Sequence, residues 1–434
     1  MHEISSIVLI FTRSRKKFPD ELSKLWVQRW QREGWKRSRW IPAANGYAGR
    51  ASSIAACCQL LQVRRQVEIK LVKSSRFFLT GNCTAGASCR HHHDVKRLAE
   101  IHKAHSGTIN SVILADGMIW TAGSDTSIRS WRPVPGPEGL QIEPAGAPVE
   151  CGEPVTSLLW DPVRKALICG LNSGNIRVFT REPLGQLDLV GHTGAVHSLV
   201  VLQNVLLSAS WDGSVRAWQG DQYTAGMVID SSRIPVGSIR ILKVFAGRMW
   251  LGGVLGVCAI DLQSLQVVLS IGTDSPVMAL LEYSPTESVI IATLSGSIRV
   301  IQQQTGLVTQ TLLMSEIEQH YGLTSAQPQS HGKGRGHSNY SWSAKGQGGK
   351  GSSTTSGIVT LEGMMLGTTG KPVIVVGDQS GTCKVFELPN MQLRGQWFAH
   401  GKGSDIRSIL NTNENNIFIT TASDGCMAVW QWQV

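Results

Sequence analysis

The chain repeats one pattern of polar and aromatic residues three times: a His, a hydroxyl residue, an Asp and a Trp. In each copy the hydroxyl residue stands four positions before the Asp, and the Asp stands six positions before the Trp. The three copies are His105, Thr121, Asp125 and Trp131; His192, Ser208, Asp212 and Trp218; and His400, Thr420, Asp424 and Trp430. Spacing this constant across 434 residues indicates one small structural unit that has been copied along the chain.

An alternation of apolar and polar residues leads up to each Trp and also recurs between the copies. It predicts one strand per unit, with one face packed and the other facing a neighbour or water. The clearest copies are 127–131, 175–179, 214–218 and 297–301, and further copies end at Ile260, Phe386 and Trp430. Successive ends lie 39 to 48 residues apart, except for one interval of 85 residues. A four-stranded blade takes ~40–50 residues, so the pattern predicts an all-β fold of seven blades.

The two ends of the repeated region predict how a ring of blades closes. The sequence ends at Val434, directly after the third strand of the last unit. Val95–Ile101 precedes the first unit and has the composition of a strand, so we expect it to pair with the last blade as its outer strand. Such pairing covers an edge that would otherwise be open. The predicted repeat domain is therefore 95–434.

The one long interval indicates an insertion at about 315–356. Its segment 330–351 carries Lys333, Arg335, Lys345 and Lys350, with no acidic residue, and contains the aromatics Tyr340 and Trp342. A stretch of this composition cannot bury enough apolar surface to fold, so we expect it to be disordered. It is either a tolerated surface insertion or a basic arm whose rings stack on nucleic-acid bases.

Residues 1–75 carry the whole net charge of the chain. They hold 15 Lys and Arg against 5 Asp and Glu, whereas the remaining residues hold 26 of each. Four of the fourteen tryptophans, Trp26, Trp30, Trp35 and Trp40, lie among these basic residues. We expect either a disordered segment, in which 19–37 becomes a helix on RNA or on an anionic membrane surface, or a stretch that was joined to the gene in error.

Residues 76–94 contain a set of metal-ligating side chains. Cys83, Cys89 and His93 follow the spacing Cys-x5-Cys-x3-His. A structural zinc site takes four ligands in a tetrahedron, and this spacing supplies three. The spacing resembles the last three ligands of a CCCH zinc finger, and this resemblance implies a first Cys at about Ser75, where only a hydroxyl stands. The segment is either a zinc site that has lost one ligand or a complete site cut by a wrong exon boundary at Ser75.

The residues 76–434 resemble two known families in succession. The unit from Gly191 to Trp218 resembles the WD-repeat β-propeller, in which His, Ser or Thr, Asp and Trp form a buried hydrogen-bonded tetrad, although the Trp-Asp dipeptide itself is absent here. Units 2, 4, 5 and 6 lack the Asp, so we expect those blades to be held mostly by apolar packing and to deviate more from the repeat. The segment 76–93 resembles a CCCH zinc finger. A CCCH finger followed at once by a seven-unit propeller resembles the zinc-finger WD-repeat proteins best known from plants.

This resemblance implies roles for residues of the finger. In that family the finger is taken to bind single-stranded RNA by stacking aromatic rings on the bases. Cys83, Cys89 and His93 would then hold zinc; Phe77 or Phe78 would stack on bases; and Arg76 and Arg90 would contact phosphates. His91 occupies the second stacking position, where the family has an aromatic ring, and this weakens the expected affinity for bases.

We predict that the chain is not an enzyme. Catalysis by a hydroxyl nucleophile needs one exposed hydroxyl beside its base and an oxyanion site, whereas three copies at constant spacing to a Trp indicate a structural role. Nine scattered cysteines indicate reduced thiols and an intracellular location, nuclear or cytoplasmic or both. No window reaches the ~20 apolar residues of a membrane span. We therefore expect a propeller that binds protein partners, joined to a finger that contacts single-stranded RNA. The alternative is a pure protein-interaction scaffold, for example a ubiquitin-ligase substrate receptor, with a non-functional finger.

Overall fold

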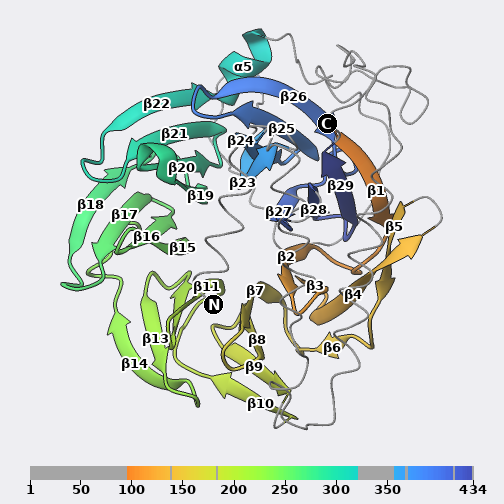
Figure 1. The fold of residues 1–434 in the computed structure, drawn as a ribbon. Helices are drawn as coiled ribbons and strands as arrows, with labels where there is room; N and C mark the ends of the chain where they lie inside the picture. Colours follow the sequence, from red (N-terminus) through yellow and green to blue (C-terminus); the bar gives the residue numbers. More distant parts are fainter. Residues whose placement is uncertain are drawn as a thin grey trace, which may run out of the picture. The chain divides into compact units, whose positions relative to one another are not determined.

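The computed structural model describes residues 95–136, 139–181, 184–320, 356–366, 370–413 and 416–432, all within one compact unit of the chain. They form seven antiparallel sheets arranged in a ring around a central axis, as Figure 1 shows. This confirms the predicted all-β, seven-bladed propeller. The basic segment 1–75, the finger at 76–94 and residues 321–355 of the insertion lie outside the described residues.

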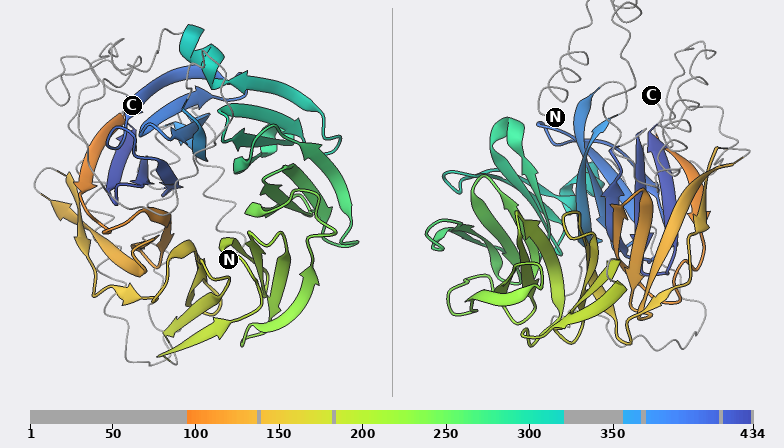
Figure 2. Two further views of the ribbon diagram at one scale, coloured as in Figure 1. Left: turned by 180° about the vertical axis from the view of Figure 1, so that it is seen from behind. Right: turned by 60° about the horizontal axis from the view of Figure 1, so that its bottom comes forward.

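In six of the seven blades the strands follow chain order from the axis to the rim, as the turned view in Figure 2 also shows. Blade 1 comprises β2 (Ile109–Ala115), β3 (Met118–Gly123), β4 (Ser127–Gly136) and β5 (Gly139–Pro144), and the short β6 (Val149–Glu150) also pairs with β4. Blade 2 comprises β7 (Val155–Asp161), β8 (Ala166–Leu171), β9 (Ile176–Arg181) and β10 (Leu184–Leu189). Blade 3 comprises β11 (Val196–Leu202), β12 (Val205–Ser210), β13 (Val215–Gln219) and β14 (Thr224–Ile229).

The next three blades repeat this order. Blade 4 comprises β15 (Ile239–Phe245), β16 (Arg248–Gly253), β17 (Gly256–Asp261) and β18 (Val267–Gly272). Blade 5 comprises β19 (Val277–Tyr283), the 3-10 turn η3 (Ser284–Thr286), β20 (Ser288–Thr293), β21 (Ser297–Gln302) and β22 (Val308–Leu313). Blade 6 comprises β23 (Ile358–Leu366), β24 (Lys371–Asp378), β25 (Thr382–Glu387) and β26 (Gln392–Phe398). All seven strand ends predicted from the alternation lie on the third strand of a blade, so the repeat count and phase are confirmed.

Blade 7 closes the ring from both ends of the repeat region. It comprises β27 (Ile406–Asn411), β28 (Ile417–Ala422) and β29 (Met427–Trp432), and its outer strand is β1 (Val95–Ile101). β1 pairs antiparallel with β29 from Val95 opposite Trp432 to Ile101 opposite Met427. The predicted closure is therefore confirmed, and the outer edge of β29 is covered.

The core lies within and between the blades. All six residues of β8 and of β20 are buried, whereas most residues of the outer strands β14 and β18 are exposed or half-buried. Between blades 6 and 7 the indole of Trp397 packs edge-on against the rings of Phe418 and Trp430, with centroids 6.0 and 5.8 Å away. Aromatic pairs in this arrangement add about 0.5–1.5 kcal/mol each beyond the area they bury.

The start of the insertion differs from our expectation. We expected disorder from about residue 315, but Met314–His320 forms helix α5 directly after β22. Met314 is 1% exposed and belongs to an apolar cluster with residues of blades 5 and 6, and the Glu318 carboxylate lies 3.2 Å from the Lys384 ammonium of blade 6. These two contacts anchor the helix, which composition alone did not reveal.

Candidate functional site

The predicted tetrad of blade 3 is a continuous chain of hydrogen bonds. The Trp218 indole donates to the Ser208 hydroxyl at 2.9 Å, Ser208 Oγ lies 2.8 Å from His192 Nε2, and His192 Nδ1 lies 2.9 Å from Asp212. Because a carboxylate can only accept, the neutral His192 ring carries its proton on Nδ1 and donates it to Asp212. Nε2 of the same ring then accepts from the Ser208 hydroxyl. Every polar atom of the four side chains along this path is used.

Blade 1 repeats this geometry, and blade 7 repeats only half of it. In blade 1 the His105 ring lies 2.9 Å from Asp125 and 2.8 Å from Thr121, which accepts the Trp131 indole at 2.8 Å. In blade 7 the His400 ring reaches Thr420 at 2.8 Å, and Trp430 donates to Thr420 at 2.9 Å. However, His400 Nδ1 lies 3.8 Å from Asp424 and is buried without a hydrogen-bond partner in the described part of the chain.

Burial and charge give these groups their protonation states. Burial lowers the pKa of His192 and His105, and the neighbouring Asp opposes this effect only in part. Burial acts to raise the pKa of Asp212, but hydrogen bonds from the Ser214 side chain and the Thr193 and Ser214 amides outweigh it and bring this pKa to about 2. The imidazoles are thus neutral and the carboxylates ionised at neutral pH.

The tetrads cannot present a nucleophile to a substrate. Thr121, Ser208 and Thr420 are each 0% exposed, and each hydroxyl is already engaged by an indole and an imidazole. A reactive hydroxyl must reach a substrate carbonyl or phosphoryl group, and these do not. The four side chains instead join the turn after the second strand to the residues that precede the first strand of the blade.

We expect the blades that lack the Asp to be held mostly by apolar packing, and blade 6 adds a buried ion pair to its apolar cluster. In blade 4 the Phe245 and Trp250 rings stack at 5.5 Å, which is apolar packing. In blade 6 the buried Lys384 ammonium lies 2.6 Å from Asp378 and is also paired with Glu318. A buried lysine is tolerated only with such partners. Lys384 is a structural residue that sequence reasoning missed, although it occupies the strand position held by Arg129, Arg177, Arg216 and Arg299 in other blades.

The predicted zinc and RNA residues lie outside the described part of the chain. These are Cys83, Cys89 and His93 for the metal, and Arg76, Phe77, Phe78, Arg90 and His91 for nucleic acid. Within the described ranges, no group of three or more His, Cys, Asp or Glu side chains is placed to hold a metal ion. No described helix is long and apolar enough to cross a membrane.

A second set of residues gathers around the propeller axis. The inner strand of every blade has a register shift at its second residue, which is the unpaired residue of a β-bulge. We call these seven residues the axial ring: Asn110, Thr156, His197, Arg240, Met278, Val359 and Arg407. The inner strands surround the axis in Figure 1, and all seven start at the same end of it. At that end the turn after each second strand donates a backbone hydrogen bond to the residue just before the inner strand, as from Trp211 to Ala195.

The charged members of the axial ring lie on blades 4 and 7. The Arg240 guanidinium lies over the Trp211 ring at 6.0 Å, and the same ring meets the His197 imidazole edge-on at 5.9 Å. Arg407 binds Asp405 at 2.9 Å. Burial and the positive charge of Arg407 lower the pKa of Arg240 to about 10, and burial together with Arg240 lowers the pKa of His197 to about 4. At neutral pH this end of the axis therefore presents two cations beside a neutral His.

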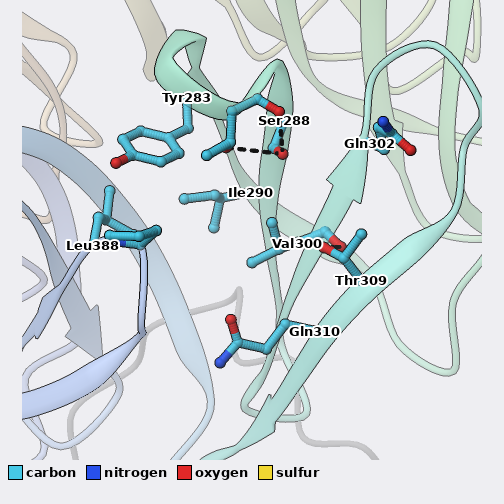
Figure 3. A pocket seen from close by; sticks show the side chains of 10 residues that line it. Tyr283, Ser288, Ile290, Val300, Gln302, Thr309, Gln310 and Leu388 are labelled. Carbon is cyan, nitrogen blue, oxygen red and sulfur yellow. Dashed lines mark hydrogen bonds between the residues drawn. The ribbon is translucent and has the colours of Figure 1, made fainter.

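A cavity of about 260 Å³ lies between blades 5 and 6 (Figure 3). In the figure, Tyr283 and Ser288 lie on one side and Leu388 reaches in from blade 6. The ten lining residues include no His, no Cys and no charged side chain, and the Ser288 hydroxyl is hydrogen-bonded to Thr286. The Tyr283 phenol is the one ionisable side chain among these ten residues, so the cavity offers no carboxylate, imidazole or thiol to a metal ion or a reacting group.

Comparison with known proteins agrees with the fold. The sequence model of the family described as WD40: WD domain, G-beta repeat, matches residues 182–219, which cover most of blade 3. Among solved structures, the crystal structure of the WD40 beta propeller domain of Doa1 superposes with a TM-score of 0.56 at 15% identity, covering 78% of this chain and 97% of that one. This likeness concerns the fold alone.

Three curated relatives are named for a CCCH zinc finger and not for a propeller. The rice (Oryza sativa subsp. japonica) protein "Zinc finger CCCH domain-containing protein 17" is 21% identical over 83% of this chain and 72% of its own length. The Arabidopsis thaliana proteins "Zinc finger CCCH domain-containing protein 48" and "63" are each 26% identical over about a third of either chain. The resemblance therefore holds: the chain carries a WD40 repeat in a seven-bladed propeller and is similar to plant proteins that are named for a CCCH zinc finger.

Proposed function

We propose that this protein is a non-enzymatic binding protein whose propeller is a scaffold for protein partners. The observation that carries the proposal is the contrast between its two sets of polar residues. The tetrad hydroxyls are 0% exposed and used by the fold, whereas Arg240, Arg407 and Trp211 are half-buried around the axis and can reach a partner. Exposed Leu255, in the turn between β16 and β17, lies at this same end and adds apolar surface.

Site-specific photo-crosslinking from the two ends of the axis tests the scaffold. Leu255 is 61% exposed at the end where the inner strands begin, and Val163 is 67% exposed in the turn after β7, at the opposite end. A photo-crosslinking amino acid at each position, in the full chain in cells, gives two matched probes. We expect partner adducts from position 255 and few from position 163. A chain that gives no adducts at either position and purifies alone would refute the scaffold.

We propose a second function for the segment before the propeller, in which a zinc-bound finger contacts single-stranded RNA. The Cys83, Cys89 and His93 spacing supports it, as do the names of the curated relatives. If Cys83→Ser lowers zinc content from about one ion per chain to none, the site holds metal. RNA affinity should then fall with salt at a log–log slope of roughly −0.7 per phosphate contact. If the wild-type chain holds no zinc and does not bind RNA at low salt, the RNA-binding function is refuted. The remaining function is then that of a pure protein-interaction scaffold, for example a ubiquitin-ligase substrate receptor.

A further inference from the structure

The axial ring places six kinds of side chain, arginine twice, at one equivalent position of the seven blades. The first residue of each inner strand is 0% exposed in all seven blades and is always Ile or Val. The next residue is the bulge residue, which varies from Asn to Arg to Met. The core therefore fixes the residue type at the first position, whereas the second position differs from blade to blade.

Some members of the ring are used by the fold, and the arginines are not. The Asn110 amide donates to the Val155 carbonyl at 2.8 Å, and the Thr156 hydroxyl donates to the Val196 carbonyl, so both tie their blade to the next one. Among the described residues, no carboxylate lies within ion-pair distance of Arg240, whose guanidinium lies over the Trp211 ring. Arg407 has one carboxylate partner, Asp405, and its Nε is buried without a partner.

The charges at the ring do not balance. Two guanidinium groups face one carboxylate, and His197 is neutral at physiological pH because of its burial and its nearness to Arg240. The two arginines are on blades 4 and 7, which face each other across the axis in Figure 1. A partly desolvated cation without a counter-charge, as at Arg240, is unfavourable, and an anion placed between the two arginines would relieve that cost. Guanidinium groups bind carboxylate or phosphate through two parallel hydrogen bonds.

We propose that the axial ring binds an acidic side chain of a protein partner, with Arg240 and Arg407 contacting its carboxylate or phosphate group. The proposal rests on the scaffold function and names the chemistry that this scaffold recognises. Trp211 and the exposed Leu255 lie at the same end and provide apolar contacts for residues that flank the acidic one.

An acidic peptide fits these observations better than RNA does. In the axial ring the apolar residues Met278 and Val359 lie between Arg240 and Arg407. The ring therefore carries two separate positive charges and no continuous row of basic side chains. A nucleic-acid backbone is bound by many basic side chains along its length. Residues 76–434 carry equal numbers of basic and acidic residues, so the propeller as a whole does not attract a polyanion.

The test uses the full-length chain and an array of 12-residue peptides whose central residue is Asp, Glu or phosphoserine, with Asn, Gln and Ser as matched neutral peptides. We expect binding only of peptides with an acidic centre, and a loss of about tenfold or more in Arg240→Gln and in Arg407→Gln. Arg132→Gln removes the same charge from an exposed position of β4 and should have no effect. Arg240→Glu should instead select peptides with a central Lys or Arg. Thermal melts of all variants exclude unfolding as the cause.

Three outcomes would overturn the proposal. One is equal binding of acidic peptides by wild type and Arg240→Gln. Another is competition by free inorganic phosphate alone, with no peptide bound, which would indicate a site for a small anion. The third is binding of a single-stranded oligonucleotide, lost in Arg240→Gln, without binding of any peptide. Crosslinks from position 255 that persist unchanged in Arg240→Gln would leave the scaffold function intact and refute only the acidic-partner inference.

Discussion

The tetrads of blades 3 and 7 allow one substitution to be compared in two geometries. In blade 3 the two oxygens of Asp212 accept hydrogen bonds from His192, from the Thr193 amide, and from the amide and hydroxyl of Ser214. In blade 7 Asp424 lies 3.8 Å from His400 and accepts hydrogen bonds from the amides of Gly401 and Cys426. Replacement by Asn keeps the shape, removes the charge and turns an N–H group toward donors.

The cost at Asp212 follows from its pKa. Lowering this pKa from 3.8 to about 2 corresponds to about 2 kcal/mol of stability at neutral pH. We therefore expect Asp212→Asn to lose about 2 kcal/mol, or about 3 °C in melting temperature for a domain of this size. Asp424→Asn should lose about half as much, because it forfeits fewer and longer bonds.

The pH dependence gives the sharper test. Because the folded-state pKa of Asp212 is depressed, the stability it contributes is fully present above about pH 4 and is lost as the pH falls toward 2. Thermal melts of wild type, Asp212→Asn and Asp424→Asn from pH 7 down to pH 3 should show the Asp212→Asn deficit shrinking. Equal deficits for the two variants at pH 7, or an Asp212→Asn deficit that is unchanged at pH 3, would refute the assignment of this energy to the charged hydrogen bonds.

Three further substitutions probe other parts of the fold. Lys384→Met should lower the free energy of unfolding in denaturant by about 3 kcal/mol, because it leaves the buried Asp378 carboxylate without its cation. The control Arg299→Met should cost less than about 1 kcal/mol, because its partner Asp274 is 59% exposed. Equal costs for the two variants would contradict the role of burial. Burial raises the pKa of Glu362 to about 7 although Lys243 opposes it, so its contribution to stability is lost as the pH rises from about 4.5 through 7; Glu362→Gln should flatten that part of the stability profile, and an unchanged slope would count against the shift. Gly425 has φ of 75°, and a Cβ there would collide with the His105 carbonyl across the ring closure, so Gly425→Ala should destabilise the protein by more than Gly117→Ala, whose Cβ would meet nothing, in the same thermal melts.

The architecture could be predicted from the sequence because it depends on period and register. Constant spacing to Trp131 and Trp218 and the alternation before them report strands directly, and the strand-like Val95–Ile101 supplied the missing partner of the last blade. The weakened tetrad of blade 7 is also visible in the sequence, as a different spacing between its His and its hydroxyl residue. His400 and Thr420 are 20 residues apart, whereas the corresponding pairs in blades 1 and 3 are 16 residues apart. The longer approach from His400 to β27 leaves the ring short of Asp424.

Other features had no such signal. Lys384 lies in an alternating strand where a basic residue normally faces solvent, and only the contact with Asp378 and with Glu318 of α5 shows that it is buried. Glu318 precedes a segment whose composition predicts disorder, so its partner could not be anticipated from sequence. Long-range pairs of this kind are set by how blades pack and not by local pattern.

The axial ring shows why a repeated fold can still be specific. Repetition constrains positions that the core uses, as with Ile239 and Ile406, which are fully buried at the start of their strands. The bulge displaces the following residue from the pairing register, so Arg240 and Arg407 take part neither in the ladder nor in the apolar clusters. Arg240 and Arg407 occupy two such positions on opposite blades, and their charge is not required by the strands that carry them. The symmetry of the fold brings such residues together at one end of the axis. A partner can be recognised there without cost to stability, because the fold does not need these side chains.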